Sequence, residues 1–153
     1  FATGRPPQEI QSVSESPFPL VILVSQKEDA SKEFEIHIGE LPKGYFPAEV
    51  TITAPEENQK EINDLPMLQP RYNPGWESYL EDGINQIRIN RELEEHPYGK
   101  REFRFTLPNE LAEKATLRIL FTLNGKRQFG YSNPAVYYTK LNKIEPIAAG
   151  QRR

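Results

Sequence analysis

The chain has 153 residues, of which 37% are hydrophobic and 27% are charged, and its formal net charge is −3. This is the length of one domain, and the slight acidic excess argues against a general nucleic-acid binder. The absence of Cys excludes disulfides, thiolate nucleophiles and zinc–thiolate sites, and two His are too few for a multi-histidine metal site. No apolar run approaches the length of a transmembrane helix. We therefore expect no nucleic-acid partner and no membrane-spanning segment.

The amino-terminal third predicts a tail and three strands. Residues 1–17 are polar and contain three prolines, which is typical of an extended tail. Residues 20–24 are all aliphatic and predict a strand that is buried on both faces or lies at an edge covered by the tail. Residues 34–38 and 49–53 alternate between apolar and polar side chains, which predicts two further strands.

The middle of the chain is less regular. Residues 54–61 are polar and predict a solvated turn, and residues 65–72 contain a short apolar segment that two prolines interrupt. Asn73-Pro74-Gly75 predicts a turn, so Trp76 falls in a turn-rich segment. Alternation around Ile87 and Ile89 predicts a strand, and residues 91–100 predict a charged loop.

The last third has the clearest pattern. Residues 102–107 alternate, and residues 109–114 predict one helical turn with Asn109 as its cap. Residues 116–123 alternate up to Asn124-Gly125, a strong hairpin signal. A three-residue loop there places Phe129 opposite Phe121 and Tyr131 opposite Ile119, with the apolar side chains on one face. Residues 135–141 predict a final strand, and residues 144–153 a second tail.

Together these patterns predict an all-β domain with about eight short strands, a β-sandwich or a barrel, and no long helix. The chain has fourteen prolines, and those that fall between the apolar runs punctuate these strands: Pro42, Pro47, Pro55, Pro66, Pro70, Pro74, Pro97, Pro108 and Pro134. We expect a tail over residues 1–17, a domain over residues 18–143 and a tail over residues 144–153. The side chains expected in its core are Ile36, Val50, Phe103, Phe105, Leu117, Ile119 and Phe121.

Residues 101–107 and 116–123, the Asn124-Gly125 dipeptide, Tyr131 and the segment Ser-Asn-Pro-Ala-Val-Tyr at 132–137 form a recognisable series. Over residues 101–141 this series resembles the last strands of an immunoglobulin-like or fibronectin type III domain. Such domains often close with a long hairpin whose second strand is broken by a small-residue and proline step. The resemblance implies a single immunoglobulin-like β-sandwich.

Residues that carry catalysis are scarce. His37 lies on the polar face of a strand and His96 precedes a proline in a charged loop, and there is no Gly-x-Ser-x-Gly elbow and no phosphate-binding glycine loop. Carboxylates occur in polar loops, as Glu56/Glu57, Glu81/Asp82 and Glu92/Glu94/Glu95. A facing pair of them in one cleft would indicate a hydrolase. Without an Asp-x-Asp-x-Asp loop we expect no calcium site, and we expect no cofactor.

The stretch 71–79 is the strongest candidate for a binding site. Arg71, Tyr72, Trp76 and Tyr79 are of the types that dominate protein-binding hot spots. Three interpretations stay open: Trp76 with one Tyr in the core, a protein-docking surface, or an aromatic platform for carbohydrate. The last requires Tyr72, Trp76 and Tyr79 to be exposed and coplanar.

We therefore expect a non-catalytic domain that acts as a protein-interaction module or as a structural or accessory subunit. A carbohydrate-binding module is the first alternative, and a hydrolase with a loop carboxylate pair is the second. Residues 77–95 are acidic and the carboxyl-terminal end is basic, which suits docking to a protein. The first residue is Phe1 and not Met, which favours an exported, processed protein over a cytoplasmic one.

Overall fold

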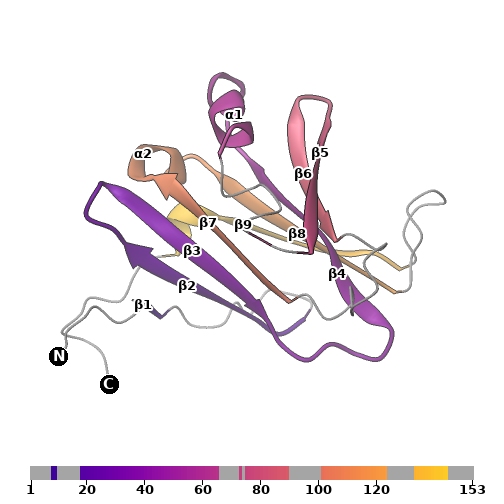
Figure 1. Ribbon diagram of the computed structural model, residues 1–153. Coiled ribbons are helices and arrows are strands. Elements are labelled where there is room, and N and C mark those ends of the chain that lie inside the picture. Colours follow the sequence, from indigo (N-terminus) through magenta and orange to yellow (C-terminus); the bar gives the residue numbers. More distant parts are fainter. Residues whose placement is uncertain are drawn as a thin grey trace.

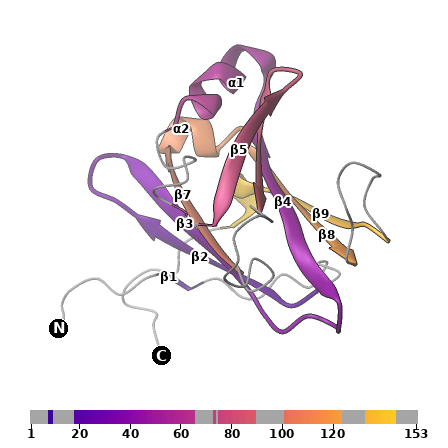
Figure 2. The same ribbon diagram turned by 45° about the vertical axis from the view of Figure 1, so that its right-hand side comes forward.

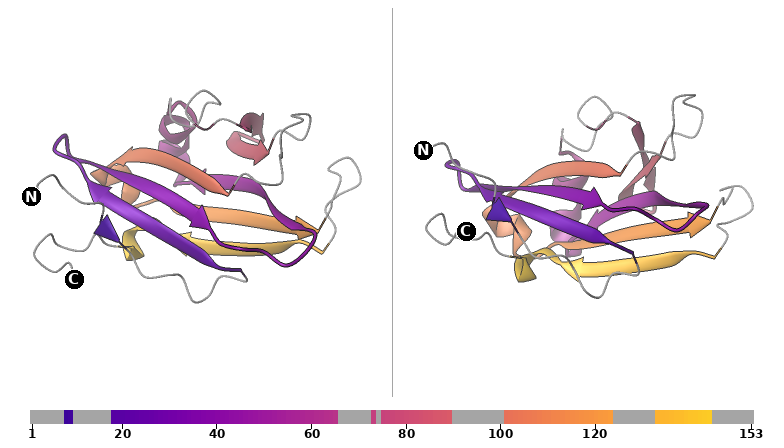
Figure 3. Two further views of the ribbon diagram at one scale, coloured as in Figure 1. Left: turned by 60° about the horizontal axis from the view of Figure 1, so that its bottom comes forward. Right: turned by 90° about the horizontal axis from the view of Figure 1, so that it is seen from below.

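The computed structural model describes residues 18–65, 73, 75–89, 101–123 and 133–144, with only the backbone of Gln8, Glu9 and Ile89. Its strands form two antiparallel sheets that face each other as a β-sandwich (Figure 1). Seen from below, with the strands running across the picture, the two sheets form separate layers (Figure 3). The expected all-β sandwich is confirmed.

The first sheet has the order β1-β2-β3-β7. Its strands are β1 (Gln8–Glu9), β2 (Leu20–Gln26), β3 (Ser31–Ile38) and β7 (Glu102–Pro108). The register places Phe34 between Val24 of β2 and Phe105 of β7, so the apolar members of each alternating strand share one face.

The second sheet has the order β5-β6-β4-β8-β9. Its strands are β5 (Trp76–Glu81), β6 (Ile84–Ile89), β4 (Tyr45–Thr53), β8 (Thr116–Leu123) and β9 (Ala135–Lys140). Strands β4 and β8 are the central pair, and β5 and β9 are the two edges. The interpretation of Trp76 as part of a turn is wrong, because it opens β5.

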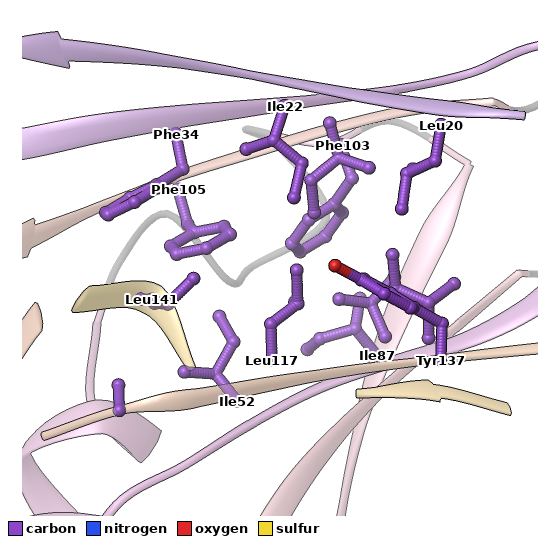
Figure 4. Close-up of a cluster of buried hydrophobic side chains, with 14 of the residues drawn as sticks. Leu20, Ile22, Phe34, Ile52, Ile87, Phe103, Phe105, Leu117, Tyr137 and Leu141 are labelled. Atoms are coloured by element: carbon purple, nitrogen blue, oxygen red, sulfur yellow. The ribbon is translucent and has the colours of Figure 1, made fainter. Parts of the chain in front are cut away.

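The core lies between the two sheets. In Figure 4, Ile22, Phe103 and Phe105 point from the first sheet toward Ile52 and Leu117 of the second. The Phe34 and Phe105 rings are stacked with their centroids 5.1 Å apart. All seven side chains expected in the core are buried: Ile36, Val50, Phe103, Phe105, Leu117, Ile119 and Phe121.

Residues 54–61 do not form a turn, because α1 (Glu56–Asn63) occupies most of them. Pro55 precedes the helix, and the first turn carries Glu56 and Glu57 at its positive end. Near its other end, Lys60 Nζ lies 2.9 Å from Asp64 Oδ2, and this hydrogen bond raises the pKa of Lys60. The helical turn expected over 109–114 is present as α2 (Asn109–Ala112), but Pro108 and not Asn109 stands at its cap position.

Two expectations about the central strands are wrong. Phe121 pairs with Ala135 and Ile119 pairs with Tyr137, so the partners on β9 are six positions later than Phe129 and Tyr131. The expected pairing across a three-residue loop at Asn124-Gly125 is therefore wrong, and residues 124–132 lie outside the described residues. Pro47 stands within a central strand, which is tolerated because a β-bulge shifts the β4–β8 register between Pro47 and Glu49.

Strands β5 and β6 form a hairpin that projects beside α1 (Figures 1 and 2). Asp82 and Gly83 both have positive φ, 53° and 78°, which fits a two-residue type I′ turn. The Asn63 side chain holds the tip: Nδ2 donates to the Gly83 carbonyl at 2.7 Å, and Oδ1 accepts the Asn85 N–H at 3.0 Å. The helix therefore fixes the direction of the hairpin.

Candidate interaction surface

The outward face of the five-stranded sheet carries polar and aromatic side chains in rows. Val50, Ile87, Ile119 and Tyr137 are buried toward the core, so their neighbours along each strand point to the other face. One row crosses all five strands in direct register, and its members are Tyr79, Gln86, Thr51, Arg118 and Tyr138. We call these five residues the central row.

A charge network lies next to the central row. Glu49 of β4 and Arg88 of β6 are register partners, and both are buried, at 5% and 4% exposure. Glu49 Oε1 accepts a hydrogen bond from Arg118 Nη1 at 3.2 Å, and Glu49 Oε2 lies 3.6 Å from Arg88 Nε. The second contact is too long for a hydrogen bond and is an ion pair. Glu49 thus neutralises two arginines from two different strands.

Arg88 also orients the edge strand. Its Nη2 donates to Glu81 Oε1 at 2.9 Å and also to Gln86 Oε1. Its guanidinium lies 4.6 Å from the centroid of the Tyr79 ring, in cation–π geometry. The Tyr79 hydroxyl donates to Glu77 Oε1 at 2.7 Å. Tyr79 is therefore held in place on β5 while part of its ring stays accessible.

The two edges of this sheet are also where apolar surface is exposed. Among the described residues the exposed large hydrophobics are Tyr79 at 43%, Leu80 at 68% and Tyr138 at 62%. The first two are in β5 and the third is in β9. Natural sheets commonly protect their edge strands with charge, proline or a covering segment, because an open edge can pair with another chain.

Trp76 is a core residue and not part of an exposed platform. It is 1% exposed, and its ring meets Phe103 of the other sheet edge-to-face, with the centroids 5.3 Å apart. Its Nε1 donates to the Glu102 carbonyl at 3.1 Å. Trp76 thus ties β5 to β7, and the exposure that a carbohydrate platform requires of it is absent.

The Asn73 side chain binds the outer edge of β7, the strand that Trp76 also contacts. Its Nδ2 donates to the Arg104 carbonyl at 2.9 Å, and its Oδ1 accepts the Arg104 N–H at 3.0 Å. The side chain therefore occupies both hydrogen-bonding groups of one residue on the edge strand. Of the other predicted site residues, Tyr79 is exposed, and Arg71 and Tyr72 lie outside the described residues.

The candidates for catalysis are placed apart. His37 has Nε2 at 3.2 Å from Glu35 and Nδ1 at 3.7 Å from Glu102, on the outward face of the first sheet. Glu56 and Glu57 open α1, and Glu81 and Asp82 lie at the hairpin tip. His96 and the group Glu92, Glu94 and Glu95 lie outside the described residues. In the part of the chain that the structure describes, no three metal-binding side chains come together.

Sequence reasoning missed the central row, because its members come from five separate strands. The strand register brings Arg118 next to Thr51, which is 67 positions earlier in the sequence, and Tyr138 next to Arg118, which is 20 positions earlier. The local signal that was available is the Asp82-Gly83 dipeptide, which is typical of type I′ hairpins and identifies β5 and β6.

Comparison with protein-family models, with curated proteins and with solved structures finds no match to this chain. None of the helices in the described residues is long and apolar enough to cross a membrane.

Proposed function

We propose that this domain is a non-catalytic protein-interaction module, or a structural subunit of a larger assembly, that uses the five-stranded sheet for contact. The observation that carries the proposal is the position of the exposed large hydrophobics, which in the described residues are confined to the two edge strands of that sheet. Tyr and Arg are enriched in protein-binding hot spots, and both types occur in the central row.

A protein partner fits this surface better than a sugar. The guanidinium of Arg88 lies over the Tyr79 ring, and Trp76 is in the core. Exposed tyrosines on edge strands stand beside backbone N–H and C=O groups, which a polypeptide can pair with. These features favour the protein partner over the carbohydrate alternative.

The immunoglobulin-like character of the sandwich is a proposal as well. Strand order supports it: β2-β3-β7 faces β4-β8-β9, as the A-B-E strands face C-F-G in immunoglobulin domains. The β5–β6 hairpin is an addition at the β4 edge, and there β6, the later strand, pairs with β4.

The test is to isolate the full chain with its native partners and identify the co-purifying proteins by mass spectrometry. Tyr79→Ser and Tyr138→Ser remove the exposed rings without touching the core. Glu110→Gln, at an exposed position in α2, is the control. We expect at least one protein that co-purifies with the parent chain and with the control but is lost from both tyrosine variants.

Two other results would contradict the proposal. An identical set of proteins with all four chains would contradict the use of this sheet. Binding of the parent chain to a panel of glycans that is abolished by Tyr79→Ser would favour the carbohydrate-binding alternative instead.

A further inference from the structure

The two edges of the five-stranded sheet match each other in length and in strand sense. Strands β5 and β9 have six residues each. Every neighbouring pair in the order β5-β6-β4-β8-β9 is antiparallel, so the first and the fifth strand have the same sense in the sheet. The sheet is twisted, so β5 and β9 cross at a steep angle in Figure 1. A copy of the molecule that is moved sideways and also rotated to continue this twist would place its β9 alongside β5 in parallel.

Both edges are accessible in the described residues, where no further strand adjoins β5 or β9. The last four residues of β5, positions 78–81, are all exposed. On β9, Tyr138 and Lys140 are exposed. Edge strands of this kind are templates for pairing with another chain.

We propose that the partner at this surface includes a second copy of the chain, docked with its β5 alongside β9 in parallel. This inference rests on the proposed interaction function and names one occupant for it. The register follows from the central row: Tyr79 and Tyr138 lie at its two ends, so sideways repetition brings Tyr138 of one copy next to Tyr79 of the other. The two six-residue strands then overlap along their whole length.

This register also places side chains of opposite charge next to each other. With Tyr79 beside Tyr138, Glu81 lies beside Lys140, and Glu77 lies beside the uncharged Val136. The two tyrosine rings, 43% and 62% exposed in the single molecule, come together on the outward face. Opposite charges and aromatic pairs across neighbouring strands each stabilise a sheet.

Symmetric pairings are less favourable. Antiparallel pairing of β5 with β5 about Tyr79 places Glu77 of one copy opposite Glu81 of the other, and like charges oppose this arrangement. Antiparallel pairing of β9 with β9 about Tyr138 places Lys140 opposite Val136, so it lacks the pair of opposite charges that the β5–β9 contact offers. The acidic edge fits the basic edge, so the contact joins different surfaces of the two molecules and leaves one edge of each kind open. Such a contact leads to a growing row of molecules or to a closed ring.

The experiment is sedimentation velocity of the full chain over a range of concentrations, in low and in high salt. We expect species larger than a dimer as the concentration rises. High salt should shift them toward the monomer, because ions screen exposed charge pairs. Glu81→Lys and Lys140→Glu should each abolish the large species. Glu28→Lys, which makes the same charge change in the exposed β2–β3 turn, should not.

Charge reversal on both sides provides the decisive control. A mixture of Glu81→Lys with Lys140→Glu, and the double variant that carries both, should recover the large species, because opposite charges again face each other. Circular dichroism melting of each variant checks that loss of association is not loss of folding.

Three results would overturn the inference. They are a monomer at all concentrations, a closed dimer that does not grow, and a mixture of the two reversed variants that stays monomeric. If the chain stays monomeric while its co-purifying protein still depends on Tyr79 and Tyr138, self-association is wrong and the proposed interaction function stands.

Discussion

At Trp76, one side chain joins the two sheets by packing and by a hydrogen bond. We expect Trp76→Ala to lower the free energy of unfolding by about 3–5 kcal/mol, because a large buried ring is lost. Trp76→Phe keeps much of the apolar volume but leaves the Glu102 carbonyl without its donor, so a loss of about 1–3 kcal/mol is expected. Urea unfolding followed by circular dichroism measures both. Equal unfolding midpoints for the parent chain and Trp76→Ala would show that the ring is not a core residue.

Glu49 is the second residue whose replacement has a defined outcome. It is the shared partner of Arg88 and Arg118 in a nearly dry setting, so Glu49→Gln leaves two guanidinium groups with less compensation. Breaking a buried ion pair costs about 3–5 kcal/mol, and we expect a loss of this order. Arg118 is more exposed than Glu49, and Arg118→Gln leaves the Arg88 contact intact, so its cost should be smaller. If urea midpoints for Glu49→Gln and Arg118→Gln coincide, the network does not work in this way.

The β5–β6 hairpin is the element whose position depends on another element. Strand β6 pairs with β4 only over Gln86–Arg88, and beyond that Asn63 of α1 holds the turn. We expect Asn63→Ala to speed amide hydrogen exchange in the tip, at Ile84 and Asn85, by one to two orders of magnitude. This corresponds to about 1–3 kcal/mol for the lost hydrogen bonds.

Amide exchange in other strands of the Asn63→Ala variant serves as the internal control. Exchange in the central strands β4 and β8 should change much less, because the link from Asn63 to β4 is indirect: Gln59 Nε2 donates to Asn63 Oδ1 at 3.1 Å and to the Ile52 carbonyl at 3.2 Å. A uniform increase in exchange across all strands would mean that Asn63 supports the whole domain and not the hairpin.

Strand positions were predictable where side chains alternate, as in β3, β7 and β8, because each strand has one face in the core. The pattern failed at β5, whose last four residues are exposed and carry no core signal. It failed at α1 because only Gln59 and Ile62 of that helix are buried, too few to show a helical period. The register of β9 was missed because the Asn124-Gly125 signal is local, whereas the pairing is set by which side chains reach the core.

At the scale of the molecule, composition and alternation were sufficient to predict an all-β fold, either a sandwich or a barrel, but not its contact surface. The central row needs five strands to be ordered side by side, and strand order depends on which crossovers the chain makes. The sequence has an acidic stretch over residues 77–95 and a basic carboxyl-terminal end. The fold places Glu81 and Lys140 from these two regions at opposite edges of one sheet. The two edges of the sheet therefore carry opposite charges, and this property cannot be read from any single segment of the sequence.

The pairing of β3 with β7 also sets a time scale for folding during synthesis. Positions 37 and 102 are 65 residues apart, and positions 31 and 108 are 77 apart, with β4, α1, β5 and β6 between them. At roughly 5–20 residues per second, a ribosome leaves β3 without this neighbour for several seconds. Glu33 and Glu35 lie on the polar face of β3, and we expect their like charges to disfavour pairing of this strand with another nascent chain during that interval.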